Sequence, residues 1–363
     1  MKIICNKSEL IRGMNIALRA VSTKTTMPIT GCVLVDASEN EISLTGNDLE
    51  SSAKTVVDGT IKEPGAIAVD AKIFNEIIRR FPDNEIKIQT DPGLNVMISS
   101  GRAKFNISGR DSDEFVKFPT VSGDKQLVVS QGRLKDAIQR TIFAISQNDS
   151  NKQMTGELFE FQKDGNLKIT ALDGHRVAIR DIDAHGDEPA KIIVPGKSLI
   201  ELSKILSDVD SDVFINYDVN NIVFDIDDEF RFSTRTIYGD YFDVNKMMNP
   251  KFATTFAVER TGFIACLNRA AIIQREGDKK PVVFDIKGDV VQLFAQSATG
   301  AAEEEIEVSK TGDDMRIGFN PHLLLDALRA VPDDDVTLRL ISPKAPCFIQ
   351  GEGYIYIVLP VNL

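Results

Sequence analysis

The chain has 363 residues, of which 42% are hydrophobic and 26% are charged, and its formal net charge is −12. This apolar fraction excludes a globally disordered chain, and the length predicts two or three domains. No run approaches the roughly 18 apolar residues of a membrane helix, and the N-terminus lacks a signal-peptide core. The acidic balance taken alone argues against a nucleic-acid partner.

The first third of the chain alternates helical and strand patterns. From Leu10, apolar residues recur at i, i+4, i+7, i+8 and i+11, which marks one face of an amphipathic helix over 7–22. A second helical pattern follows Val69 and predicts a helix over 70–82. An acidic turn then leads to strands whose connecting turns carry Gly, Asp and Asn. These strands are expected at 85–88, 96–98 and 105–107.

The same order of patterns returns twice. The first helical spacing begins again at Leu134 and Phe263, which are 124 and 129 residues after the preceding start. The second helical spacing follows Val194 and Phe319, at two steps of 125 residues from Val69. In the second copy we predict helices over 131–146 and 194–207 and strands at 213–215, 222–224 and 230–232. In the third copy we predict helices over 260–276 and 319–331 and strands at 336–338, 347–349 and 354–357.

Two elements that share one period in one order indicate an internal threefold repeat. The sequence therefore predicts an α+β protein of three domains, each with two helices packed on antiparallel sheets. The predicted domains are 1–121, 122–248 and 249–363, joined by polar linkers at 119–123 and 245–250.

Positive charge is concentrated on the six predicted helices. Together they carry a net charge of +8, which leaves −20 for the rest of the chain. If the helices share one side, that side is positive and attracts phosphates without reading base sequence. The alternative is that these Lys and Arg residues are ordinary solvated helix surfaces.

Several chemistries lack a motif in this chain. The four cysteines Cys5, Cys32, Cys266 and Cys347 form no CxxC pair, which favours buried thiols in a reduced, cytoplasmic protein. The three histidines form no metal motif, and no nucleotide-binding or GxSxG motif occurs, so we expect no metal and no cofactor. A Mg²⁺-dependent nuclease using Asp225, Asp227 and Asp228 remains one alternative, and a repeat scaffold that binds only proteins remains another.

Five segments resemble the bacterial sliding clamp, the beta subunit of DNA polymerase III. They are Ser43–Glu50, Gly156–Glu160 with Leu172–Ala178, Ile193–Pro195 with Ile200–Leu202, Ile317–Asn320 and Tyr356–Leu363. The resemblance covers the whole chain in order. It implies a non-enzymatic processivity factor, a head-to-tail dimer that forms a ring around double-stranded DNA and tethers the replicative polymerase.

The resemblance also implies roles for individual residues. The positions that match DNA-facing sites are Lys24, Lys72, Arg79, Lys152 and Lys197. The positions that match a peptide-binding pocket are Leu172, Gly174, His175, Arg176, Val177, Met247, Asn320, Leu323, Pro346, Val358, Leu359, Pro360, Val361 and Leu363. The positions that match the dimer interface are Arg102, Lys104, Phe105, Ile107, Ile272, Ile273, Glu303, Glu304 and Glu305.

Partners implied in the same way are the polymerase III alpha subunit, a clamp-loader ATPase and other proteins with a clamp-binding motif. The sequence departs from the family's usual pattern at Phe242 and Lys246, near the pocket. It also departs at Ala301 and Ala302, where acidic residues are common. We therefore expect a seam in which burial of apolar side chains outweighs ion pairs.

Overall fold

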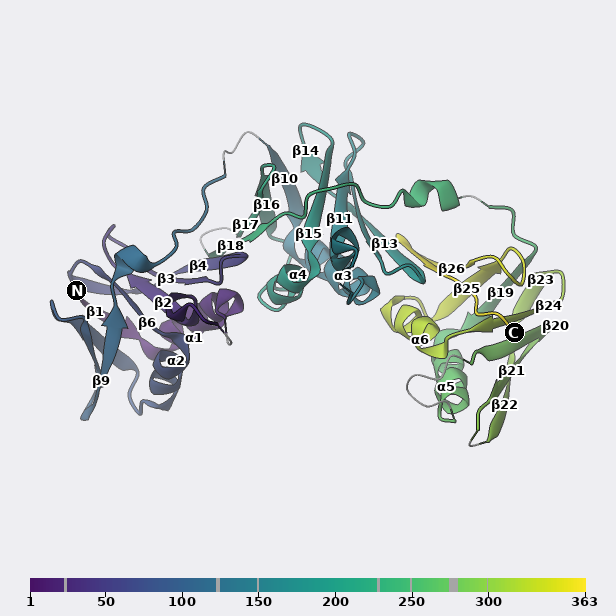
Figure 1. The fold of residues 1–363 in the computed structure, drawn as a ribbon, viewed down its shortest axis with the longest axis horizontal. Helices are drawn as coiled ribbons and strands as arrows, with labels where there is room; N and C mark the ends of the chain where they lie inside the picture. Colours follow the sequence, from purple (N-terminus) through teal and green to yellow (C-terminus); the bar gives the residue numbers. More distant parts are fainter. Residues whose placement is uncertain are drawn as a thin grey trace. The chain divides into compact units, whose positions relative to one another are not determined.

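The structure is a computed structural model, and it describes residues 1–22, 25–121, 125–148, 150–226, 229–248, 250–273, 280–298 and 300–363. Within these ranges all six predicted helices are confirmed (Figure 1). They are α1 (Lys7–Ala17), α2 (Ala71–Arg80), α3 (Gln131–Thr141), α4 (Gly196–Ser203), α5 (Arg260–Ala271) and α6 (Pro321–Ala330). Short 3₁₀ turns follow α1 and α3, the second being η4 (Ile142–Ala144).

Each repeat also has nine strands in the described ranges. The first contains β1 (Lys2–Asn6), β2 (Cys32–Asp36), β3 (Ile42–Asn47), β4 (Ser51–Val57), β5 (Gly59–Glu63), β6 (Ala66–Asp70), β7 (Glu85–Thr90), β8 (Asn95–Ser100) and β9 (Ala103–Arg110). The second contains β10 (Gln126–Ser130), β11 (Gly156–Phe161), β12 (Asn166–Leu172), β13 (Arg176–Asp183), β14 (His185–Gly186), β15 (Ala190–Pro195), β16 (Asp212–Tyr217), β17 (Asn221–Ile226) and β18 (Phe230–Arg235). The third contains β19 (Thr254–Glu259), β20 (Val282–Lys287), β21 (Val290–Gln296), β22 (Ala301–Glu307), β23 (Ser309–Gly312), β24 (Met315–Phe319), β25 (Asp335–Leu340), β26 (Cys347–Gly351) and β27 (Tyr354–Val358).

Strand pairing repeats with the sequence. β1 pairs with β5 and β7, β10 with β14 and β16, and β19 with β23 and β25, all antiparallel. The three strands at the end of each repeat then form a meander, for example β7-β8-β9. The threefold repeat predicted from the sequence is therefore confirmed strand by strand.

Local sequence explains where the helices begin. The side chains of Asn6, Asp70 and Asn320 each accept a hydrogen bond from a backbone N–H in the first turn of the following helix. Asn and Asp are favoured at this position because they satisfy donors that the helix itself leaves free. In the third repeat, α5 and α6 lie side by side and bury their apolar faces with strands of both surrounding sheets.

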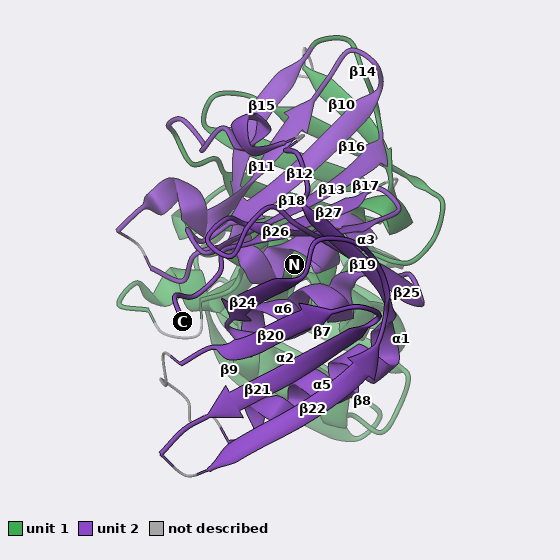
Figure 2. Cartoon of the chain, turned by 90° about the vertical axis from the view of Figure 1, so that its right-hand side faces the viewer, with its two compact units in different colours: residues 1–135, 184–188, 197–238 green, residues 136–183, 189–196, 239–363 purple. Residues whose placement is uncertain are grey.

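The chain divides into two compact units, and the second repeat contributes to both (Figure 2). Unit 1 comprises residues 1–135, 184–188 and 197–238, and unit 2 comprises residues 136–183, 189–196 and 239–363. In unit 1, β18 pairs with β4 and joins the first two repeats into one 14-stranded sheet. In unit 2, β27 pairs with β13 within a nine-stranded sheet. The predicted domain boundaries fall at residues 122 and 249, outside the described residues, and stay a prediction.

Candidate functional site

Exposed basic side chains recur on the second helix of each repeat. Lys72 on α2 corresponds to Lys197 on α4 and to His322 on α6, at steps of 125 residues. All three side chains are exposed. Lys72 and Lys197 make no ion pair within the described chain, so their charge is available to a partner.

A second set lies two turns further along, on α2 and α6 and directly after the end of α4. Arg79, Lys204 and Arg329 are also 125 residues apart, and all three are exposed. Of these three residues, only Arg79 was predicted from the sequence to face DNA. The repeat period itself was the signal that could have found Lys204 and Arg329.

Not every basic helix residue is available. Arg140 on α3 is half-buried, its Nε contacts Asp136 Oδ1 at 2.6 Å, and it also donates to the Ala330 carbonyl. Its charge is therefore neutralised inside unit 2. Lys152 is exposed on a 3₁₀ turn, Lys152–Thr155, whereas Lys24 lies outside the described residues.

An apolar cavity of about 180 Å³ lies in unit 2. It lies where the paired strands β13 and β27 face the segment that follows β18. Seven residues assigned to the peptide pocket line it, namely Leu172, Gly174, His175, Arg176, Val177, Met247 and Leu359. Met154, Phe242 and Ile357 complete the lining.

Strand alternation explains which residues reach this cavity. Val177 pairs with both Leu172 and Ile357, so the three side chains share one face of the sheet. Val358 faces the other way and is fully buried in the core of the third repeat. The other assigned residues outside the lining are Asn320, Leu323, Pro346, Pro360, Val361 and Leu363.

A tight turn forms the rim of the cavity. Gly174 has φ +90, which favours glycine, and a Cβ built there meets no atom within 4 Å. The Asp173 carboxylate accepts hydrogen bonds from the backbone N–H groups of His175 and Arg176. The turn therefore holds His175 at the exposed edge.

Arg176 forms one wall of the cavity and is held on every side. Its Nε contacts Asp173 Oδ2 at 2.9 Å, its Nη1 contacts Asp326 Oδ2 at 2.6 Å, and its Nη2 donates to the Phe143 carbonyl at 2.6 Å. Burial alone lowers the pKa of Arg176, but Tyr356 and the two carboxylates outweigh burial and raise it. The guanidinium is thus a permanent, oriented charge.

The corresponding surface at the first junction is polar. Asn47, Ser52 and Ser233 occupy the register positions of Leu172, Val177 and Ile357. The Asn47 side chain donates to the carbonyl of Val116, in the segment that follows β9. An apolar face at this position is therefore a property of the second junction and not of the repeat.

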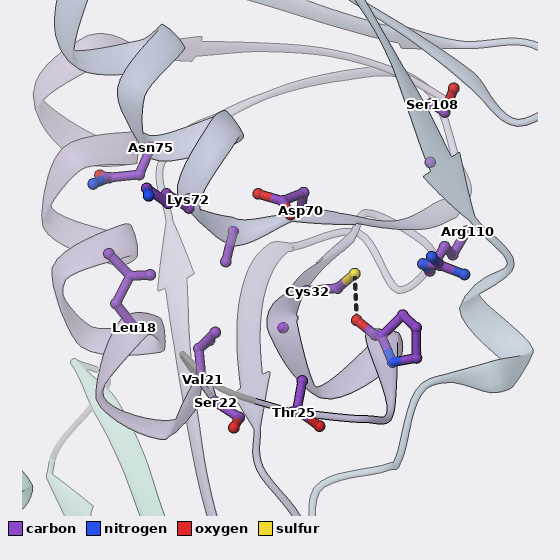
Figure 3. A pocket seen from close by; sticks show the side chains of 14 residues that line it. Leu18, Val21, Ser22, Thr25, Cys32, Asp70, Lys72, Asn75, Ser108 and Arg110 are labelled. Atoms are coloured by element: carbon purple, nitrogen blue, oxygen red, sulfur yellow. Dashed lines mark hydrogen bonds between the residues drawn. The ribbon is translucent and has the colours of Figure 1, made fainter.

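Unit 1 contains a wider hollow of about 830 Å³ (Figure 3). Lys72 and Asn75 lie on one wall and Arg110 on the opposite wall, and the Cys32 thiol donates to the Pro28 carbonyl at 3.4 Å. Asp70 lies between the cations, so the lining charges do not converge on one kind of ligand.

Two strand edges carry the residues assigned to the dimer interface. β9 pairs with β8 along one edge, and only its end, at Gly109 and Arg110, pairs with β6. β22 pairs only with β21 in the described chain. Phe105 on β9 is 44% exposed, and Ile272 after α5 is 78% exposed. Such unpaired edges favour strand addition by another chain.

The remaining assigned interface residues surround these edges. Arg102 and Lys104, which are near Phe105 in the sequence, are exposed. Glu303 and Glu305 on β22 are exposed as well. Ile107 and Ile273 are half-buried. Glu304 faces α5, where its Oε2 contacts Arg269 Nη2 at 2.6 Å.

The alternative nuclease site is not supported. Asp225 contacts Arg231 at 2.9 Å, and Asp227 and Asp228 lie outside the described residues. Among the described residues no cluster of His, Cys, Asp and Glu is arranged to hold a metal ion. The helices in the same ranges are all too short or too polar to cross a membrane.

Comparisons with known proteins identify the family. Models of the DNA polymerase III beta subunit match residues 1–119 (N-terminal domain), 128–243 (central domain) and 246–359 (C-terminal domain). The beta sliding clamp of Staphylococcus epidermidis is 30% identical over all of this chain and 99% of its own length.

Solved structures agree. A DNA polymerase III beta subunit from Eubacterium rectale is 44% identical, with a TM-score of 0.96 over all of this chain and 99% of its own. A DNA polymerase sliding clamp from Bacillus subtilis is 28% identical, with the same TM-score and coverage. The chain belongs to the DNA polymerase III beta subunit family, the bacterial sliding clamps, and is a non-catalytic processivity factor of DNA replication.

Proposed function

We propose that two copies of this clamp close head to tail into a ring around double-stranded DNA. The observation that carries the proposal is the strand register inside the chain. At the first junction Phe232 on β18 lies opposite Ala53 on β4, and at the second Tyr356 on β27 lies opposite Ala178 on β13. All four residues are fully buried.

The same register supports a third junction, between two chains. Phe105 is the repeat equivalent of Phe232 and Tyr356, and Ala302 is the equivalent of the two alanines. Phe105 would therefore lie opposite Ala302 of a second copy. Antiparallel pairing then brings Lys104 opposite Glu303, and charges of opposite sign support this register. A contact between unlike surfaces that closes after two copies gives two identical seams.

The cations of α2, α4 and α6 support a duplex as the molecule inside the ring. They recur at equivalent positions in an otherwise acidic chain, as a lining for phosphates requires. Phosphate contacts carry no base information, so they would permit sliding.

Reversing the charge of Lys72, Arg79 and Lys197 together is expected to weaken retention on DNA. The slope of log affinity against log salt concentration should become shallower by roughly 3 for each chain. Each lost phosphate contact reduces this slope by about 0.9, and three contacts are lost. The matched control reverses Lys62, Lys163 and Lys344, which are exposed outside the helices. Equal salt dependence in the two triple variants would contradict the assignment.

We also infer that the apolar cavity docks peptides of the polymerase III alpha subunit, the clamp loader and other proteins with a clamp-binding motif. Its mixed lining of Met, Leu and Val suits several related peptides. The absence of such an apolar face at the first junction supports one docking site per chain.

Replacing Leu359 with aspartate is expected to raise the Kd of a fluorescent polymerase-tail peptide by about 100-fold, because a charge replaces an apolar wall. Leu359 is 38% exposed, so the fold should tolerate the change. Ile73→Asp, at an exposed apolar residue on α2, is the control. Anisotropy titration measures both, and an unchanged Kd in Leu359→Asp would refute the pocket.

A closed ring must be opened to reach circular DNA. The sequence has no nucleotide-binding motif, so a clamp-loader ATPase would supply that work. The four cysteines are buried free thiols, which supports action in the reducing cytoplasm.

A further inference from the structure

Asp326 on α6 contacts two arginines that face different sites. Its Oδ2 contacts Arg176 Nη1 at 2.6 Å, and its Oδ1 lies 3.9 Å from Arg329 Nη1. Arg176 is 11% exposed and lines the apolar cavity, whereas Arg329 is 58% exposed at a position we assign to the duplex. One carboxylate therefore lies between the two proposed binding surfaces.

The carboxylate at the equivalent position of the second repeat also contacts two basic side chains. Glu201 precedes Asp326 by one period of 125 residues; its Oε2 contacts Arg19 at 3.3 Å and its Oε1 contacts Lys204 at 2.5 Å. The sheet face at that junction is polar and offers no counterpart of the apolar cavity. Glu201 therefore provides a matched control for Asp326.

We propose that Asp326 couples phosphate contact at Arg329 to the wall of the apolar cavity. The inference rests on the proposed function. In the free clamp the carboxylate is shared between two guanidinium groups. When a phosphate engages Arg329, Asp326 interacts with Arg176 alone, and the cavity wall becomes more ordered. The two states differ in defined contacts, as coupling between two sites requires.

The position of Arg176 explains how this change reaches the cavity. Its guanidinium also contacts the carbonyl of Phe143 and the carboxylate of Asp173. Asp173 in turn holds the turn of Gly174 and His175. A more tightly held Arg176 thus steadies the rim and one wall together. We expect DNA to slow amide exchange at this rim by about two- to fivefold. The effect is small because the ion pair between Asp326 and the exposed Arg329 is weak.

Amide hydrogen exchange of residues 172–177 tests the coupling. The probe is a duplex of about 30 base pairs at low salt, which a ring can thread from its free ends. We expect DNA to slow exchange in the wild type and in Glu201→Gln, and to leave it unchanged in Asp326→Asn. Arg329→Gln should already show slow exchange without DNA, because Asp326 is released to Arg176.

DNA binding is measured on the same samples by anisotropy. If Asp326→Asn binds DNA normally and DNA slows its amide exchange as much as in the wild type, the coupling is overturned and the clamp function stays intact. Fast exchange in DNA-free Arg329→Gln also overturns it. Absence of DNA binding by the wild type overturns the proposed function, and the coupling with it.

Discussion

Replacing Phe105 with aspartate is expected to convert the clamp from a dimer into a monomer. Phe105 is 44% exposed, while its repeat equivalents Phe232 and Tyr356 are fully buried. Burying one such side chain contributes about 1.5–3 kcal/mol, and the two seams of a ring each contain one. An aspartate there also leaves a carboxylate without a partner in an apolar contact. The dimer Kd should rise by at least about 100-fold, as measured by sedimentation equilibrium.

The control for this experiment is Val219→Asp. Val219 is 77% exposed in the turn between β16 and β17, and it belongs to neither of the strands β9 and β22 that we assign to the seam. The proposed pairing of Lys104 with Glu303 gives a sharper test. Lys104→Glu alone should weaken the dimer, and the double variant Lys104→Glu with Glu303→Lys should restore it. A Phe105→Asp protein that remains dimeric would exclude the β9–β22 seam.

The sequence predicted the helices and the last three strands of each repeat because apolar spacing recurs with the repeat. The first six strands of each repeat were not predicted one by one, and further errors lie at helix ends. The predicted helix 194–207 begins only at Gly196, since Val194 and Pro195 still belong to β15, which pairs with β11. The predicted helix 260–276 ends at Ala271 in the described residues. Apolar spacing cannot locate such ends, because buried strand residues have the same character.

The cavity was only partly predictable. Ile357 and Val358 are both apolar neighbours on β27, and only the pairing with β13 determines that Ile357 faces the cavity. Likewise, counting charge on helices could not reveal that Arg140 also donates to the Ala330 carbonyl at the end of α6. Register and side-chain partners are tertiary properties, and a spacing pattern along one chain does not contain them.

Glu157 on β11 is a buried carboxyl group at an apolar position of the repeat. Strand register aligns it with Val33 and Val282, and all three are fully buried. Its Oε1 accepts a hydrogen bond from Thr141 Oγ1 at 2.8 Å, and its Oε2 has no partner in the described chain. Burial raises the pKa of Glu157 to about 8, although the Thr141 bond opposes this.

This raised pKa makes stability depend on pH with a definite sign. Between the ordinary Glu pKa and about 8 the folded state holds a proton that the unfolded state has lost, so stability falls as pH rises. From pH 6 to pH 8 the free energy of unfolding should fall by about 2 kcal/mol from this group. Glu157→Gln should abolish that decrease, because the amide does not ionise.

Chemical denaturation at pH 6, 7 and 8 measures the effect. Glu39→Gln, at an exposed carboxyl, serves as the control. Its free energy of unfolding should change with pH as in the wild type. The double variant Thr141→Ala with Glu157→Val has the residue types of the equivalent positions Ala17 and Val33, which are buried in the core of the first repeat, and it should be more stable at every pH. An unchanged slope in Glu157→Gln would mean that the carboxyl is already ionised in the folded clamp, with a counter-charge or water reaching its Oε2.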